Sequence, residues 1–432
     1  MKDNMKFVLT SCALFVCGVI AGSFLPTNQP KIKDKELISI IDAWNLTKEY
    51  YLLHVDKEKL KNGALEGMAK SLDPHSSWLP PKNAEEFSQV LKGEYGGVGM
   101  KFTVNDNDAL ITNIKSGGPA YKAGIVKGDI ILEVNGKKVS KENLDKLELK
   151  GKPGTLMNLK IKKLNGDIKE YNIKRETIAG FEVESETKLV KNDNFLKIRI
   201  QDFQETTANE VAAEIRNNWK KKDYKALIID LRSSPGGLVT SSAQLASLFL
   251  PPNKTVVNIK TRFDSEESTL KTIKYADEEW SNWARQVPII IWADKGTASA
   301  AEILLSSLRE NNRVDFFIGQ QTFGKGTVQN VFDIDDGGYK MSMAWYTTPK
   351  NRYIQGNGEV PDVKLIYPKE IESKLKEYAE QNLPGYIQPP KKEKYSQLKN
   401  LGEYNVPKEA FNNLDSMDNY LWNLTYNINS KI

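Results

Sequence analysis

Histidine and cysteine are almost absent from the chain, and each absence excludes a class of chemistry. The 432 residues include only 2 histidines, His54 and His75, both in the first fifth of the sequence. A serine activated by a nearby histidine and carboxylate is therefore not expected. The 2 cysteines, Cys12 and Cys17, both lie in an apolar N-terminal run. The rest of the chain thus has no disulfide and no thiolate metal site, and we predict no metal and no cofactor.

An excess of one charge is also lacking. The chain has 61 basic and 56 acidic residues, a formal net charge of +5, and the two signs are interleaved. Because it has no arginine-rich block and no stripe of basic and aromatic residues, we predict no nucleic-acid partner. At about 150 residues per domain, the length predicts two or three domains.

The first 30 residues differ in character from all that follow. Lys2 and Lys6 precede an uncharged run whose apolar part extends from Phe7 to Leu25. A basic start before an apolar run is typical of a signal peptide or a membrane anchor. We therefore assign residues 1–30 to one of these and expect the protein to be exported. Residues 7–25 would associate with the membrane if the segment is not cleaved.

Residues 31–91 are predicted to form an N-terminal helical region. Apolar residues recur from Leu37 at mostly three- and four-residue spacing, which indicates two short amphipathic helices. The sequence Asp73-Pro74-His75-Ser76 ends this pattern, because proline disfavours helix at the preceding residue. We interpret His75 as a hydrogen-bonding residue of this turn and not as a catalytic group.

Residues 92–178 open with a glycine-rich loop and continue with a strand, a short helix near Ala120, a Gly-Asp turn and an Asn-Gly hairpin. Landmarks in this order resemble a PDZ domain. Successive N–H groups in such a loop bind an anion, and a free strand edge accepts an extended peptide. A simple tight turn is the alternative. We predict that a C-terminal carboxylate binds at the loop, which consists of Gly96, Gly97, Val98, Gly99 and Met100.

Residues 179–380 alternate between strand and helix patterns. Strands are predicted over 195–200, 226–231 and 288–293, and helices over 206–219, up to Phe249, and from Ser299 to about Leu308. Repeated strand, turn and helix units predict an α/β core with parallel pairing. Sites in such cores form in the loops that follow the strands.

Three of these loops carry residues suited to hydrolysis. Ser299 lies where a helix begins, so that the N–H of Ala300 would favour a nearby negative charge; helix capping with Glu302 is the alternative. Lys325, between two glycines, could act as a base if burial lowers its pKa, whereas its rival Lys295 has polar neighbours. The adjacent glycines 236 and 237 could add an oxyanion donor or form a plain turn.

Together, these motifs resemble the carboxyl-terminal processing proteases, also called tail-specific proteases, over residues 35 to 366. The resemblance implies a multidomain fold with an inserted PDZ domain and an α/β core of the crotonase and ClpP-like type. It implies a serine endopeptidase in which Ser299 is the nucleophile, Lys325 the general base and Gln329 the residue that orients the lysine. The oxyanion hole would comprise Ala300 and one of Gly236 and Gly237.

The resemblance also implies partners and a location. Substrates would be proteins or peptides with apolar C-terminal tails, and an adaptor protein and a homo-oligomer are further expectations. We expect the bacterial periplasm or cell envelope, with anchoring to the inner membrane if the N-terminal segment is retained. The alternative is a catalytically silent PDZ scaffold that binds protein C-termini. Residues 381–432 are assigned to a linker and a helix, Met417 to Ile428, that packs on its own domain or forms a dimer contact.

Overall fold

The computed structural model describes residues 34–431 except 93, 106–107, 116, 141–146, 148–150, 180–182, 263–266, 276–277, 374–398 and 412–413. The predicted signal peptide or anchor therefore lies outside the described residues. No helix within the described ranges is long and apolar enough to span a membrane.

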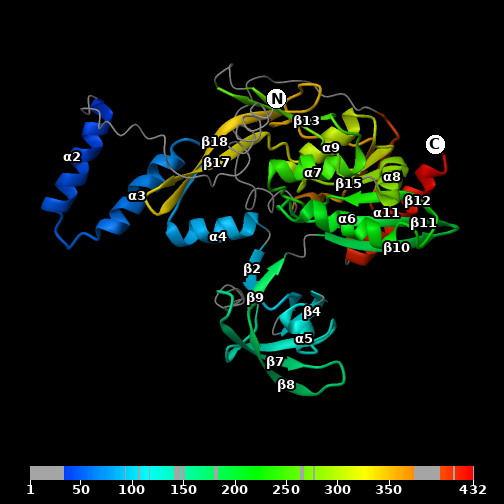
Figure 1. The fold of residues 1–432 in the computed structure, drawn as a ribbon, viewed down its shortest axis with the longest axis horizontal. Coiled ribbons are helices and arrows are strands. Elements are labelled where there is room, and N and C mark those ends of the chain that lie inside the picture. Colours follow the sequence, from blue (N-terminus) through cyan, green and yellow to red (C-terminus); the bar gives the residue numbers. More distant parts are fainter. Residues whose placement is uncertain are drawn as a thin grey trace, which may run out of the picture.

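The N-terminal region forms an arm that projects from the body of the molecule (Figure 1). It comprises α2 (Lys35–Tyr50), α3 (Lys57–Lys70), β1 (Ser77–Leu79) and α4 (Pro81–Leu91). Asp34 and Asp56 cap the first two helices, since their carboxylates accept hydrogen bonds from first-turn N–H groups. Helix α2 buries none of its side chains. Sequence periodicity predicted the first two helices but not α4 or β1.

A separate β-rich lobe follows the arm. Its sheet has the order β3-β4-β5-β7-β8, with β6 beside β5, and every pairing is antiparallel. The lobe has its own buried core, which includes Ile111, Ile131 and Leu159. Its elements are β3 (Met100–Asn105), β4 (Asp108–Ile114), α5 (Pro119–Lys122), β5 (Ile130–Val134), β6 (Lys137–Lys138), β7 (Leu156–Lys162) and β8 (Ile168–Lys174).

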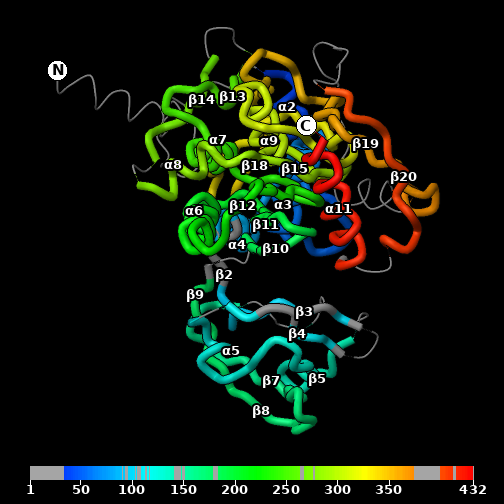
Figure 2. Tube along the Cα trace, turned by 90° about the vertical axis from the view of Figure 1, so that its right-hand side faces the viewer, coloured from blue at the N-terminus to red at the C-terminus, as the bar shows by residue number. Residues whose placement is uncertain are grey.

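Two short strands join this lobe to the body, β2 (Glu94–Gly97) and β9 (Glu176–Ala179). Figure 2 shows the lobe below the body, with β2 and β9 between them. Both connections therefore run through one two-stranded ribbon.

The body is built on a seven-stranded sheet of order β10-β11-β12-β15-β16-β19-β20. All pairs are parallel except β10 with β11. Together with the β-rich lobe, this sheet confirms the predicted multidomain α/β fold. The strands are β10 (Val183–Val190), β11 (Asp193–Ile200), β12 (Tyr224–Asp230), β15 (Ile289–Ala293), β16 (Phe316–Gly319), β19 (Val363–Ile366) and β20 (Glu403–Asn405).

Helices cover both faces of this sheet. On one face, Leu227 and Ile229 of β12 pack in the core formed with four helices, α6 (Thr207–Asn218), α7 (Val239–Phe249), α8 (Glu279–Gln286) and α9 (Ala300–Glu310). On the other face, Ala226 and Ile228 pack in the core that includes α11 (Leu414–Asn429) and the 3-10 turn η3 (Lys408–Phe411). Alternate residues of one strand thus serve two cores, as expected for a sheet buried on both sides.

A second, antiparallel sheet connects the arm to the body. Strand β1 of the arm pairs with β18 (Gly337–Thr347), which also pairs with β17 (Thr327–Ile334) and β13 (Thr255–Thr261). Strand β14 (Ser268–Lys271) completes the sheet beside β13. The arm therefore contacts the hairpin β17–β18, which begins two residues after Lys325.

Helix α11 packs on its own domain. Trp422 contacts Trp292 with ring centroids 5.1 Å apart. Asp418 forms ion pairs with Lys197 of β11 and with Arg232 at the end of β12, the latter at 2.6 Å. Of the two roles predicted for this helix, the structure shows the packing role.

Replacing Asp418 with alanine is expected to reduce the free energy of unfolding by about 1–3 kcal/mol, because the buried Lys197 and Arg232 would each lose one carboxylate while keeping Glu186 and Asp230 as partners. Urea denaturation measures the change. Asn419→Ala, at an exposed position of the same helix, is the control and should change the value by less than about 0.5 kcal/mol. A loss below about 1 kcal/mol for Asp418→Ala would contradict this role of the ion pairs.

Candidate active site

Ser299 lies between β15 and α9, at the N-cap position of the helix, with φ 55° and ψ −120°. Positive φ is uncommon for a residue with a side chain and persists only where the surroundings hold it. The Ser299 N–H donates to the Glu302 carboxylate at 2.9 Å, and the residue is 7% exposed. The predicted pairing of Ser299 with Glu302 at the helix start is thus present, and it fixes a strained serine.

Glu302 is fully buried and accepts four hydrogen bonds. One carboxylate oxygen accepts from the Thr322 hydroxyl and from the Gly324 N–H at 2.8 Å. The other accepts from the N–H groups of Ser299 and Lys325, each at 2.9 Å. Burial raises the pKa of Glu302 to about 7, and the donated hydrogen bonds oppose this rise. One carboxylate therefore joins the serine loop to the lysine loop.

This second role of Glu302 is not evident from its local sequence. A glutamate three residues after a helix-initial serine has the same pattern whether it only caps the helix or also binds a distant loop. The Gly-Lys-Gly sequence was the available signal, because a glycine-rich loop exposes backbone N–H groups that need an acceptor.

Lys325 lies in the loop between β16 and β17, where glycine is required on both sides. A Cβ on Gly324 would lie 2.9 Å from the N of Gly358, and one on Gly326 would lie 2.5 Å from the N of Gln355. The Tyr346 hydroxyl contacts the carbonyl oxygens of both Ser299 and Lys325. These contacts place the two backbone segments next to each other.

The Lys325 amine has an unusually low proton affinity. Burial lowers its pKa to about 8, and the positive charge of Lys340 acts in the same direction, whereas Glu302 and Asp73 oppose the shift. A larger fraction of neutral amine is therefore present near neutral pH than for an ordinary lysine. The rival Lys295 instead forms an ion pair with Glu372 at a partly exposed position.

Of the two predicted oxyanion glycines, Gly236 lies against the serine. With φ +91°, a Cβ at this position would lie 2.6 Å from the Ala300 nitrogen and 2.9 Å from Ser299 Cβ. A Cβ on Gly237 would instead meet the carbonyl oxygen of Phe203 at 2.2 Å. Among the described residues, the N–H groups of Ala300, Gly236 and Gly237 donate to no protein acceptor. All three donors are thus free to bind another acceptor.

Gln329 lies on β17, and its amide nitrogen donates to the hydroxyls of Thr327 at 2.9 Å and Ser342 at 3.1 Å. Within the described part of the chain, no hydrogen bond joins its side chain to Lys325. Because both bonds use the nitrogen, the carbonyl oxygen of the amide is left as an acceptor. The predicted role of Gln329 in orienting the lysine stays a prediction.

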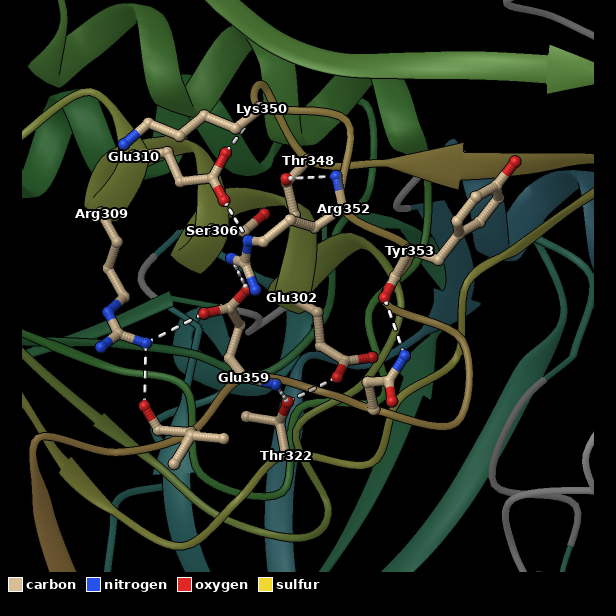
Figure 3. A network of polar contacts seen from close by, with 12 residues as sticks. Glu302, Ser306, Arg309, Glu310, Thr322, Thr348, Lys350, Arg352, Tyr353 and Glu359 are labelled. Atoms are coloured by element: carbon tan, nitrogen blue, oxygen red, sulfur yellow. Dashed lines mark hydrogen bonds and ion pairs between the residues drawn. The ribbon is translucent and has the colours of Figure 1, made fainter. Parts of the chain in front are cut away.

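A network of buried charges supports the lysine loop (Figure 3). The Thr322 hydroxyl, which donates to Glu302, accepts from the N–H of Glu359 at 2.7 Å. The Glu359 carboxylate forms ion pairs with Arg309 of α9 at 2.9 Å and with Arg352 at 2.7 Å. Buried charges are tolerated only when they are paired. The ion pairs therefore hold Glu359 in place, and Glu359 in turn holds Thr322 against Glu302.

The structure also places His75 near the lysine. It is 5% exposed, and burial and the charge of Lys325 lower its pKa to about 4. The turn itself matches the prediction, since Asp73 accepts from the N–H of His75 at 2.7 Å. Its position beside Lys325 was not predicted, because the two residues are far apart in sequence.

In the β-rich lobe, the predicted carboxylate-binding residues divide into two groups. Gly96 and Gly97 lie in β2 and pair with β9. Val98, Gly99 and Met100 lead into β3, with Gly99 at φ +76°. Strand β3 is at the edge of its sheet in the described chain. Lys101 on β3 contacts Glu184 and Gln201 of the body at 3.2 and 3.3 Å.

Comparison with known proteins identifies the class of protein to which the two parts of the chain belong. Residues 96–174 match the family model of the PDZ domain, and residues 194–365 match that of peptidase family S41. The chain therefore combines a PDZ domain with a serine peptidase core.

Individual relatives narrow the class. The carboxy-terminal processing protease CtpA of Bacillus subtilis is 33% identical over 367 residues, which is 84% of this chain and 75% of that protein. A probable CtpA-like serine protease of Staphylococcus haemolyticus is 31% identical over 84% of this chain and 71% of its own length. A structure titled photosystem II D1 C-terminal processing protease has a TM-score of 0.43 at 22% identity, covering 77% of this chain and 93% of that one. The chain belongs to the carboxy-terminal processing proteases of peptidase family S41.

Replacing Gly236 with alanine is expected to reduce kcat/KM by at least about 100-fold, because the added methyl would enter the space beside the Ala300 N–H. Peptide cleavage and circular dichroism measure activity and folding. Gly166→Ala is the matched control, since Gly166 has φ +90° but no atom near its added Cβ. Equal activity of the two variants would show that the Gly236 contact does not serve the site.

Proposed function

We propose that this protein hydrolyses peptide bonds through an acyl-enzyme formed on Ser299, with Lys325 as the general base. The observation that carries the proposal is the Glu302 carboxylate oxygen, which accepts from the N–H groups of both residues at 2.9 Å. The lowered pKa of the Lys325 amine supports its role as a base. Neither feature is needed in a protein that only binds peptide tails.

In the proposed reaction, neutral Lys325 takes the proton of the Ser299 hydroxyl while the serine oxygen bonds to the carbonyl carbon of the substrate. The bond from that carbon to nitrogen then breaks, and the lysine returns its proton to the departing amine. Water next attacks the acyl carbon while Lys325 accepts one of its protons. The bond from that carbon to the Ser299 oxygen then breaks, and the lysine passes its proton to this oxygen. All protons are thus conserved over the cycle.

We propose that the oxyanion of the tetrahedral intermediate accepts hydrogen bonds from the N–H of Ala300 and from an N–H of the Gly236–Gly237 pair. All three groups lack a protein acceptor among the described residues, and Gly236 touches the serine. The position of Ala300 in the first turn of α9 adds the favourable end of a helix dipole. For Gln329, we infer that its carbonyl oxygen accepts from Lys325 and orients it.

Ser299→Ala and Lys325→Ala are each expected to reduce peptide cleavage by at least about 10³-fold while leaving the protein folded. Cleavage of an apolar-tailed peptide, followed by mass spectrometry, measures the loss. Lys295→Ala is the control, because Lys295 pairs with Glu372 near the protein surface and should be dispensable for chemistry.

Two outcomes would contradict the assignment. Wild-type cleavage by Ser299→Ala would exclude the proposed nucleophile. Tight binding of the tail peptide by a wild-type protein that cleaves nothing would favour the silent scaffold.

The PDZ domain is proposed to hold the C-terminal tail of the substrate. Val98, Gly99 and Met100 provide a loop for the terminal carboxylate, and the edge of β3 offers backbone groups to an extended peptide. The contacts of Lys101 with Glu184 and Gln201 put β3 next to the peptidase domain. The main-chain carbonyl oxygen of Gln201 in turn accepts a hydrogen bond at 2.8 Å from the hydroxyl of Ser234, which lies in the oxyanion loop (residues 232–237).

Amidation of the C-terminus of the peptide substrate is expected to raise KM about tenfold or more and to change kcat little, since a charge-assisted contact made equally before and during reaction is lost. Steady-state kinetics on free and amidated peptides of one sequence measure both constants. Equal KM values would show that the terminal carboxylate is not recognised.

Location and assembly are further proposals. The basic and apolar character of residues 1–30 supports export to the periplasm or cell envelope, with inner-membrane anchoring if the segment is retained. A homo-oligomer and an adaptor protein stay predictions.

A further inference from the structure

The turn that ends α3 is fixed by one aspartate. A carboxylate oxygen of Asp73 accepts from the N–H groups of His75 at 2.7 Å and Ser76 at 2.9 Å, and the other accepts from the Ser76 hydroxyl at 2.8 Å. With three such bonds the four-residue turn has a single defined shape, as in turns in which an aspartate binds its own backbone.

This turn packs on β18, the strand whose Ser342 hydroxyl accepts a hydrogen bond from the Gln329 side chain. Directly after it, β1 pairs with β18 in the register Ser77 with Lys340. The Ser342 N–H donates to the Ser76 hydroxyl at 3.3 Å, and the Ser342 hydroxyl accepts from the Gln329 amide at 3.1 Å. A continuous set of hydrogen bonds therefore connects Asp73 with Gln329 across two elements far apart in the sequence.

Charges of opposite sign surround the lysine on this side. Asp73 and the buried, neutral His75 lie on the turn, Lys340 lies on β18 and Glu302 lies on α9, whereas Glu66 of α3 acts on Lys340. Asp73 raises the pKa of Lys325 and Lys340 lowers it, while Asp73 and Glu66 act on Lys340 in turn. The turn and the strand on which it is seated therefore act on the lysine in opposite directions.

We propose that the segment Asp73-Pro74-His75-Ser76, together with Ser342 and Lys340, is a positioning wall of the catalytic site. Asp73 and Lys340 balance the charge around Lys325, His75 excludes water from it, and Ser76 and Ser342 hold the amide of Gln329. This inference rests on the proposed function of Ser299 and Lys325. It gives the N-terminal arm a part in the chemistry, through the groups that position Lys325 and Gln329.

If Asp73 and Lys340 act on Lys325 through their charges, replacing them should shift the pH dependence of cleavage in opposite directions. Only the neutral amine accepts the serine proton, so kcat/KM should rise with pH through the pKa of Lys325, about 8. Asp73→Asn removes a charge that favours the protonated amine, and its midpoint should fall by about half a pH unit. Lys340→Gln removes a charge that disfavours the protonated amine, and its midpoint should rise by a similar amount.

The experiment compares pH profiles of kcat/KM for the full-length protein and these variants. Asp335→Asn is the matched control: Asp335 binds Lys61 of α3 at 2.7 Å, so it joins the same arm to the same hairpin, but through an exposed contact. Its midpoint should equal that of the wild type. Midpoints of Asp73→Asn and Lys340→Gln that coincide with the wild type, or move in one direction, would overturn the proposal.

Ser342→Ala tests the hydrogen-bonded part. Loss of one of the two hydrogen bonds that hold the Gln329 amide should lower kcat about tenfold and leave KM unchanged, as the loss of groups that orient a functional side chain commonly does. An unchanged kcat would remove Ser342 from the wall. Failure of the proposed function is distinguishable, because cleavage would then persist in Ser299→Ala or Lys325→Ala, whereas failure of the wall alone leaves cleavage dependent on both residues.

Discussion

The burial of one carboxylate, that of Glu302, is the constraint on which the site depends. A buried carboxylate is costly unless donors surround it, and here four donors from the N-cap of α9 and the lysine loop do so. The same bonds hold Ser299 at a positive φ and fix the backbone of Lys325 beside it. Helix capping and the proposed catalytic geometry are therefore one arrangement, and the strain at the serine is offset by hydrogen bonds to the glutamate.

The rest of the molecule surrounds this arrangement in successive layers. Thr322 and the ion pairs of Glu359 support the glutamate from behind, and the hairpin β17–β18 carries Gln329 and Lys340 at its side. The PDZ domain approaches from the sheet edge through Lys101, which contacts Gln201 close to the oxyanion loop. The sites proposed for the substrate tail and for the scissile bond thus lie on adjacent parts of one chain.

Local sequence patterns predict those features of the fold and the site that depend on residues close together in the sequence. The order of strands and helices in the core follows from periodicity. Ser299 and Lys325 could be identified because each lies in a segment that follows a buried strand. Contacts between distant segments could not be predicted. The second role of Glu302, the place of His75 beside Lys325 and the seat of Ser76 on Ser342 all depend on how the two sheets meet. The register irregularity of β17 at Gln329 likewise leaves no mark in the sequence.

The central claim is that burial keeps the Lys325 amine neutral enough to act as a base. The most direct measurement is the pH dependence of its acetylation by a trace reagent, followed by mass spectrometry in the Ser299→Ala protein, where no cleavage intervenes. We predict that the reactivity of this amine titrates with a pKa of about 8. A pKa near 10.4, the ordinary value for lysine, would contradict the account.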